Sequence, residues 1–181
     1  KPDQVIFSPW EDFDFEGRFI QADFGNLSVI SIYIPSGSAK QERQDYKMDF
    51  MTERFMPYLE ELQKDGREYI ICGDINIVHK KIDIKNFNGN KNRSGCLPEE
   101  RAWLDQLFGE AGFIDAFREI NQEADQYTWW SNRGQAWANN TGWRIDYHIL
   151  SANLKGTPQR AEVYKDERFS DHSPLIIDYD F

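Results

Sequence analysis

The segment Tyr69-Ile70-Ile71-Cys72-Gly73-Asp74-Ile75-Asn76 decides the fold, because an apolar run ends abruptly in polar residues. A short apolar run bounded by turn residues is typical of a buried strand. If the strand continues, Asp74 and Asn76 point to the same side of it. Open α/β sheets place their chemistry at the carboxyl ends of such strands. Asp, Gly and Asn are also the commonest turn residues, so a simple strand-to-loop cap is the better explanation of this segment taken alone.

The segments before this strand predict a hairpin and a helix. Residues 18–24 and 27–34 are strand-like, and the Gly25-Asn26 pair between them favours a hairpin turn. Residues 42–64 carry apolar side chains at helical spacing. Pro57 lies within that pattern and is expected to kink or interrupt the helix.

A long polar loop and a second helix are expected after the strand. The loop spans 79–97, and Pro98 opens a helix to about Phe108, with Glu99 and Glu100 at its positive end. Strands mixed with two sizeable helices predict an α/β domain with helices layered over sheets. Further strand-like pieces lie near 113–117, 127–131, 143–150, 160–164 and 174–180.

The composition indicates one domain covering residues 1–181, because the chain is long enough for a substantial core and has no low-complexity linker. No apolar run approaches membrane-spanning length and no signal-peptide pattern is present, so no membrane partner is expected. Cys72 lies in an expected core strand and Cys96 in a loop. A disulfide is therefore not suggested, and a reducing, cytoplasmic compartment is the expectation.

The net charge of -10 argues mildly against a nucleic-acid partner, because phosphate binders usually carry a basic excess. Net charge is not local charge, however, and metal-binding carboxylates would add to the negative count. One face could be basic, since residues 79–101 contain six cations: Lys80, Lys81, Lys85, Lys91, Arg93 and Arg101.

A histidine that could take part in catalysis lies in a short loop before the last expected strand. Asp171 and His172 are adjacent there, and adjacent side chains generally diverge, so they are not expected to pair. A carboxylate from elsewhere could orient the imidazole and stabilise its cation, and Asp146 is the obvious candidate. His79 and His148 have no such surroundings and are interpreted as structural or exposed.

Two further groups could contact a nucleic acid. Trp129 and Trp143 are equally well explained as core residues or as walls of a pocket for a sugar or an extruded nucleotide. The loop carries amides and cations, which are the side chains that follow a phosphate backbone, although a solvated loop explains them too. These loop residues are Asn86, Asn88, Asn90, Lys91 and Arg93.

In chain order, these motifs resemble those of the exonuclease III family of abasic-site endonucleases, within the endonuclease/exonuclease/phosphatase superfamily. The resemblance covers nearly the whole chain, and Pro98-Glu99-Glu100-Arg101 after an Asn/Lys loop separates it from the phosphatase branches. It implies a four-layered α/β sandwich of the DNase I-like type, with two mixed sheets face to face and helices outside. The motifs that carry it are Tyr33, Gly73-Asp74-Ile75-Asn76, Leu97-Pro98-Glu99-Glu100-Arg101, Trp143-Arg144-Ile145-Asp146-Tyr147 and Ser170-Asp171-His172-Ser173-Pro174.

The resemblance also implies catalytic roles for five residues. Tyr33 would contact the scissile phosphate. Asp74 would handle protons on the water or the leaving group, and Asn76 would orient beside it. Asp146 would hydrogen-bond the catalytic histidine, which is His172.

A metal site and a DNA surface are implied as well. Asp171, together with Asp74 and Asn76, would belong to a Mg²⁺ site, with Mn²⁺ as the alternative. Hard oxygen ligands suit both ions, and the sequence has no Cys/His zinc pattern. Contacts with DNA are expected from Arg43, Asn90, Lys91, Arg93, Trp129 and Trp143.

The sequence departs from the family at its start and in one turn. Family members begin with a strand bearing an asparagine and a second strand whose Gln-Glu pair provides a principal metal ligand, and residues 1–17 already lie past that point. We interpret the chain as lacking these first strands, so a separate amino-terminal polypeptide or a second copy could cover the exposed sheet edge. Ser36 lies in a turn where the family often has Asn or Gln.

The predicted function is a Mg²⁺-dependent DNA repair nuclease that cleaves phosphodiesters at abasic sites and from 3′ ends of duplex DNA. Cleavage by this chain alone is expected to be weak or absent, because the glutamate ligand is missing. One alternative is a related phosphoesterase acting on RNA or small phosphate esters, which the loop 79–97 and the tryptophans disfavour. The other is a non-catalytic DNA-binding module, which would bind DNA but not Mg²⁺.

Overall fold

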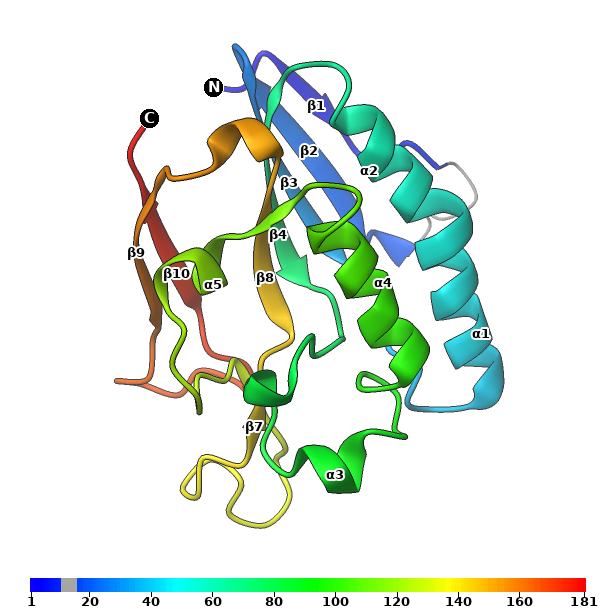
Figure 1. Cartoon of the computed structure of the whole chain (residues 1–181), viewed down its shortest axis with the longest axis vertical. Coiled ribbons are helices and arrows are strands. Elements are labelled where there is room, and N and C mark those ends of the chain that lie inside the picture. The colour runs from blue at the N-terminus through cyan, green and yellow to red at the C-terminus, as the bar shows by residue number, and fades with distance from the viewer. Residues whose placement is uncertain (11–15) are drawn as a thin grey trace.

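The computed structural model describes residues 1–10 and 16–181. Its central element is a six-stranded mixed sheet in the order β1-β2-β3-β4-β8-β5 (Figure 1). The strands are β1 (Gln4–Ile6), β2 (Phe19–Phe24), β3 (Leu27–Tyr33), β4 (Glu68–Asp74), β8 (Asp146–Leu150) and β5 (Ile114–Asp115).

The register of this sheet sets three polar residues in one row. The expected hairpin is present, since β2 and β3 are antiparallel around Gly25-Asn26. Strands β3 and β4 run parallel, which brings Tyr33 opposite Asp74. Strand β8 runs antiparallel to β4, which brings Asp146 opposite Asp74 on the other side. The end of the apolar strand β4 is therefore flanked by polar side chains from both of its neighbours.

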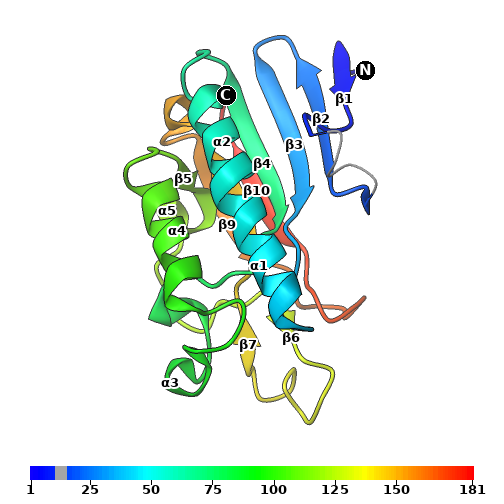
Figure 2. The same cartoon turned by 90° about the vertical axis from the view of Figure 1, so that its right-hand side faces the viewer.

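One face of the sheet is covered by α1 (Gln41–Phe50), α2 (Met56–Leu62) and α4 (Pro98–Phe108), as Figure 2 shows. The interruption expected at Pro57 takes the form of a π-helical turn, Met51–Phe55, between α1 and α2. Proline has no N–H to donate, so a local change of the helical hydrogen-bond pattern accommodates it. The main core packs beneath these helices, with Ile30, Ile71 and Leu104 fully buried.

The opposite side carries the antiparallel pair β9 (Pro158–Val163) and β10 (Leu175–Tyr179). The short helix α5 (Ala116–Ile120) packs against β8 and β9, and a second apolar cluster lies among them. A third, two-stranded sheet joins β6 (Trp129–Trp130) to β7 (Gly142–Trp143). The predicted class, an α/β domain with helices layered over a mixed sheet, is confirmed.

Several predicted boundaries were wrong for local reasons. The strand expected at 113–117 ends at Asp115, whose carboxylate accepts a hydrogen bond from Arg118 N and caps α5. The strand expected at 143–150 divides into β7 and β8, because Arg144 turns inward. The loop 79–97 contains a 3₁₀ turn, Lys81–Asp83, and α3 (Phe87–Asn90); another 3₁₀ turn, Ala152–Leu154, follows β8.

Apolar side chains are exposed on the part of the sheet near the amino terminus. Val5, Ile20 and Phe24 are 41%, 41% and 43% exposed, respectively. That another polypeptide covers this strip stays a prediction. Among the described helices, none combines the length and the apolar character that a membrane crossing requires.

Candidate active site

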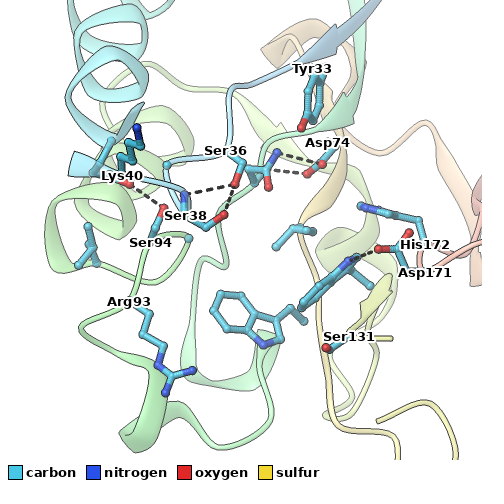
Figure 3. A pocket seen from close by; sticks show the side chains of 18 of the residues that line it. Tyr33, Ser36, Ser38, Lys40, Asp74, Arg93, Ser94, Ser131, Asp171 and His172 are labelled. Carbon is cyan, nitrogen blue, oxygen red and sulfur yellow. Dashed lines mark hydrogen bonds between the residues drawn. The ribbon is translucent and has the colours of Figure 1, made fainter. Parts of the chain in front are cut away.

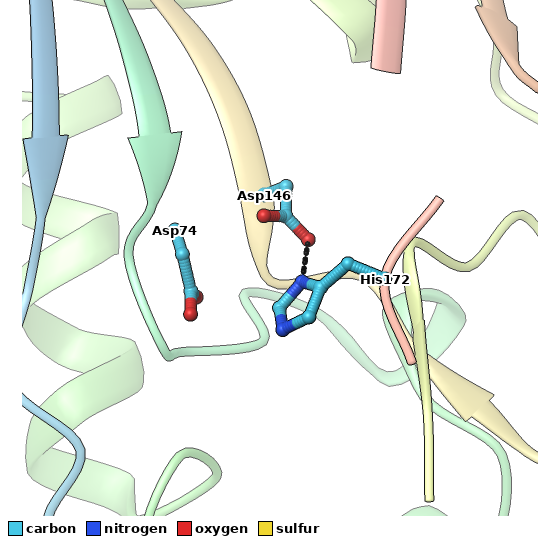
Figure 4. A group of neighbouring side chains, drawn as sticks. All are labelled: Asp74, Asp146 and His172. Carbon is cyan, nitrogen blue, oxygen red and sulfur yellow. Dashed lines mark hydrogen bonds and ion pairs between the residues drawn. The ribbon is translucent and has the colours of Figure 1, made fainter. Parts of the chain in front are cut away.

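The candidate site lies where the row of residues at the end of β4 meets the loop before β10. His172 in that loop places its Nδ1 atom 2.9 Å from Oδ2 of Asp146, so the expected pairing is present. Figure 4 shows Asp74 on β4 and Asp146 on β8, with His172 reaching them from a third segment. Ligand atoms of these three side chains all lie within 4.8 Å of one another.

The loop that carries the histidine is held by its own hydrogen bonds. Ser170 Oγ accepts from His172 N at 2.9 Å and donates to His172 O at 3.0 Å. Asp171 diverges from His172, as expected, and its Oδ2 accepts from Trp129 Nε1 at 3.0 Å. The loop is also anchored to β6, because Trp130 N donates to Asp171 O at 2.9 Å. These contacts fix the direction of both side chains.

The Asp74–Asn76 turn brings its two side chains together differently from the sequence prediction. Strand β4 ends at Asp74, and Asn76 has a φ of 56°, so the chain turns through the left-handed region, which Asn tolerates well. Asn76 N donates to Asp74 Oδ1 at 2.8 Å, and Asn76 Nδ2 donates to Asp74 Oδ2 at 3.0 Å. The two side chains are adjacent because of a turn and not because the strand continues.

Gly73 allows the strand to approach its neighbour closely at this point. Its φ is 150°, and a Cβ atom there would lie 1.8 Å from the Ile32 carbonyl oxygen. Any side chain would therefore displace β3 from β4 directly beside Asp74.

The charges of the site are not balanced within the protein. Burial, together with the nearby Asp146 carboxylate, raises the pKa of Asp74 to about 7. Burial alone would lower the pKa of His172, but its hydrogen bond to Asp146 and the surrounding negative charge outweigh this and raise the pKa. A cation that reached this site would relieve the repulsion between the two carboxylates.

Asp74 and His172 open into a cavity of about 1050 Å³, which Asp171 also lines (Figure 3). Trp129 and Trp143 form one wall, with their rings edge to face at 6.0 Å. Lys40, Arg93 and Arg133 also line the cavity, and their charged groups have no ion-pair partner in the part of the chain that the structure describes. The cavity thus combines an acidic floor, an aromatic wall and free cations.

Most of the residues predicted for the site line this cavity, but four do not. Asp146 lines a smaller neighbouring cavity, together with His172. Arg43 faces Glu16 at 3.6 Å instead. Asn90 Nδ2 donates to Asn86 O at 3.0 Å within α3, and Lys91 is exposed outside the lining. The predicted residues that line it are Tyr33, Asp74, Asn76, Arg93, Trp129, Trp143, Asp171 and His172.

Sequence reasoning missed Lys40 and Arg133, since neither belongs to a motif and both come from turns whose direction the sequence does not reveal. It also gave no role to Ser38 or Ser94, which lie beside Ser36 in the lining. Ser36 Oγ lies 2.9 Å from Ser38 Oγ.

A divalent metal ion fits the donor atoms of this site. The described acidic and histidine side chains that group closely are Asp74, Asp146 and His172, and Asp171 lies outside this group. Because His172 is already paired with Asp146, the oxygen atoms of Asp74, Asn76 and Asp171 are the better donors for a hard cation. Burial and the nearby Asp146 carboxylate raise the pKa of Asp74, and a cation at this carboxylate would oppose that rise.

The site thus combines an oriented histidine that faces a carboxylate with a partly basic cavity, at the end of the central strand of a layered α/β fold. Residues 3–172 match the family described as the Endonuclease/Exonuclease/phosphatase family, and the chain belongs to this family.

Relatives within this family carry the names of nucleases. The exodeoxyribonuclease of Bacillus subtilis is 39% identical over 179 residues, which are 98% of this chain and 70% of the relative. The DNA repair nuclease APEX1 of Danio rerio is 38% identical over 169 residues, which are 92% of this chain and 53% of the relative. The family resemblance and the predicted class, a nuclease-type phosphodiesterase, are confirmed.

A solved structure confirms the fold. That of an AP endonuclease from Archaeoglobus fulgidus superposes with a TM-score of 0.89 at 27% sequence identity. It matches 100% of this chain and 72% of its own. The relatives are thus longer than this chain, which agrees with the expectation that part of the family's usual length lies outside it.

Proposed function

We propose that this chain carries the catalytic core of a DNA repair nuclease that hydrolyses phosphodiesters at abasic sites and from 3′ ends of duplex DNA. The observation that carries the proposal is the Asp146–His172 pair facing Asp74 at the floor of a cavity with a tryptophan wall. The names of the relatives, an exodeoxyribonuclease and a DNA repair nuclease, support the choice of substrate.

The side chains divide the chemistry between them. With its Nδ1 proton donated to Asp146, His172 presents Nε2 to a phosphoryl oxygen and stabilises the charge that develops there. Asp74, with a pKa near 7, can accept a proton from the attacking water or return one to the leaving oxygen near neutral pH. Tyr33, 43% exposed at the end of β3, can donate to the same phosphate.

Mg²⁺ is the proposed metal, with Mn²⁺ as the alternative. Asp74, Asp171 and the Asn76 amide oxygen would hold it, and it would supply positive charge to the phosphoryl oxygens. The chain's own contribution is to fix the Asn76 amide beside Asp74. Asn76 Nδ2 bridges Asp74 Oδ2 and Ile34 O, so within the described residues Asn76 Oδ1 is the amide atom left without a hydrogen bond.

DNA would be held by the rim and the wall of the cavity. Arg93, Lys40 and Arg133 are available for phosphates, so a local cationic rim offsets the net charge of -10. Trp129 and Trp143 would flank an abasic sugar, whose extrusion costs little because it has no base to unstack. Arg43, Asn90 and Lys91 would contact DNA further from the reacting phosphate. Two free cysteines, Cys72 and Cys96, fit the proposed cytoplasmic location.

The test is cleavage of a fluorescent duplex that contains a tetrahydrofuran abasic site, and of a 3′-recessed duplex, with Mg²⁺ and with EDTA. We expect slow cleavage that requires Mg²⁺ and is lost in His172→Asn. Turnover equal to that of an intact relative would contradict the expected impairment. Faster hydrolysis of an RNA hairpin or of p-nitrophenyl phosphate would favour the alternative phosphoesterase. DNA binding without Mg²⁺ binding or cleavage, measured by calorimetry, would favour the binding module.

A further inference from the structure

A fully buried ion pair lies directly behind the Asp74–Asn76 turn. Lys47 on α1 and Glu100 in the first turn of α4 are both 0% exposed, and Lys47 Nζ lies 2.7 Å from Glu100 Oε1. Removing two charges from water is costly, and well-packed apolar residues in their place are often neutral or stabilising. Stability alone therefore does not explain why charges occupy this position.

The pair connects the helical layer to the active-site turn. Besides Glu100, Lys47 Nζ donates to the backbone carbonyl oxygen of Asn76 at 2.9 Å. Glu100 Oε1 also accepts from Gln44 Nε2 at 3.0 Å, and its Oε2 accepts from Leu97 N at 2.9 Å. The carboxylate thus holds the ammonium group in place, and the ammonium group holds Asn76.

Asn76 depends on this contact more than an ordinary turn residue would. Its N–H and both Nδ2 protons are already used, and within the described residues its carbonyl oxygen has Lys47 as hydrogen-bond donor. Its φ of 56° lies in the left-handed region, which Asn tolerates but does not adopt by default, so the surrounding contacts select this conformation. Gly95 also packs against this carbonyl, since a Cβ atom there would lie 3.0 Å from Asn76 O.

We infer that Lys47, held by Glu100, is a positioning residue that keeps Asn76 in its left-handed conformation and thereby directs Asn76 Oδ1 and the Asp74 carboxylate into the cavity. The inference rests on the proposed function for its effect on catalysis. The effect of Lys47 on the turn is independent of the proposed function, because the hydrogen bond to Asn76 O acts with or without a substrate.

Three variants test the inference. Lys47→Met removes the donor to Asn76 O and leaves Glu100 buried without its counter-charge. The double variant K47M/E100Q removes both charges. Lys64→Met is the matched control, because Lys64 pairs with Glu61 at 2.6 Å but is 65% exposed and lies before the start of β4, whereas the turn follows the other end of that strand.

The cleavage assay separates positioning from support of the fold. We expect Lys47→Met to lower kcat by about 30- to 100-fold with KM changed less than about threefold, because small misplacements of reacting groups are costly. In K47M/E100Q the urea midpoint should recover most of the loss, while kcat stays low. Recovery of kcat together with the urea midpoint would overturn the inference, since the pair would then support only the fold. Lys64→Met should change neither quantity.

Amide hydrogen exchange provides a readout that needs no activity. Peptides that span residues 73–79 should exchange at least about tenfold faster in Lys47→Met and in K47M/E100Q than in the unmodified chain, and not in Lys64→Met. Unchanged exchange there would overturn the inference. If the unmodified chain cleaves no substrate, the proposed function fails, and this measurement still decides whether Lys47 positions the turn.

Discussion

Two clusters of acidic side chains adjoin the segment that follows β4, one partly buried and one buried, and they differ in how their charge is balanced. One contains Asp74 and Asp146 and opens into the cavity. The other contains Asp83 and Asp115 and is closed. Both place carboxylates in surroundings that disfavour negative charge, so the partners of each cluster decide how it behaves.

In the closed cluster, arginine neutralises the acids. Arg144 is fully buried, with Nε 2.7 Å from Asp83 Oδ1 and Nη2 2.6 Å from Asp115 Oδ2. Arg118 Nη2 lies 2.6 Å from the same Asp83 oxygen. Burial alone would raise the pKa of Asp83, but the two guanidinium groups outweigh it and lower the pKa to about 2. This cluster joins the loop after β4 to β5, to α5 and to the connection between β7 and β8, and so serves the fold.

In the open cluster, no arginine or lysine pairs with the acids among the residues that the structure describes. His172 is the only charged partner within hydrogen-bond distance there, and the pKa of Asp74 rises to about 7. A carboxyl group that titrates near neutral pH can exchange protons, whereas Asp83 stays ionised near neutral pH and already holds two guanidinium groups. The missing counter-charge therefore distinguishes the cluster to which we assign the proposed chemistry.

Replacing Arg144 should have the largest effect on stability. Arg144→Met leaves Asp83 and Asp115 buried without their main counter-charge, and we expect a loss of about 3–5 kcal/mol in the free energy of unfolding at pH 7. Urea denaturation measures it. Arg160→Met is the control, because Arg160 also pairs with two carboxylates but is 56% exposed, and it should cost less than about 1 kcal/mol. Similar losses in both variants would contradict the scaffold role.

Asp74→Asn should have the opposite effects, with little or no loss of stability and a large loss of cleavage. Because the folded protein raises the pKa of Asp74 from 3.8 to about 7, it disfavours the charged form, and this acid costs stability as the pH rises through that range. In metal-free buffer the variant should thus be as stable as the unmodified chain, or more stable, at pH 8. Cleavage should fall by about 100- to 1,000-fold. Greater destabilisation at pH 8 than at pH 5 would contradict this comparison.

Asp146→Asn should lower the pKa of His172, which NMR titration of the three imidazoles would report. A raised histidine pKa stabilises the fold below the ordinary value of 6.5, and this stabilisation disappears as the pH rises through the folded-state pKa. The variant should therefore lose about 1 kcal/mol at pH 5.5 and less at pH 9. His148, whose Nδ1 lies 2.8 Å from Tyr179 Oη, is the internal control and should titrate unchanged. A loss that grows with pH would refute the pairing.

The sequence predicted the open cluster better than the closed one. Asp74, Asp146 and His172 stand in short polar motifs after apolar strands, and their roles followed from a family resemblance. No comparable sequence motif indicated the closed cluster, because Asp83 lies in a predicted loop and Asp115 in a predicted strand. Which arginine turns inward depends on tertiary packing, since an exposed and a buried arginine look alike in a sequence.

The register of the sheet could not be predicted from the sequence either. The alternation of strands and helices predicted the fold class, but the row of Tyr33, Asp74 and Asp146 exists only because β3 and β8 flank β4 in a particular alignment. Lys47 is a similar case. Its position on a helix predicts a solvated side chain, and only the fold shows that this lysine is buried behind Asn76.

The side chain of Asp171 has a hydrogen-bond partner, as in the closed cluster, but no counter-charge, as in the open cluster, because that partner is a neutral indole. Trp129→Phe keeps an aromatic wall but removes the Nε1 donor to Asp171 Oδ2, worth about 1 kcal/mol. We expect Mg²⁺ to bind about three- to tenfold more weakly, measured by calorimetry, because the carboxylate is no longer held in one direction. Trp143→Phe is the control, since Trp143 shares the aromatic pair and has no such hydrogen bond among the described residues. Equal effects of the two substitutions on Mg²⁺ affinity would show that both tryptophans act only as the aromatic wall. The backbone of the loop would then suffice to orient Asp171.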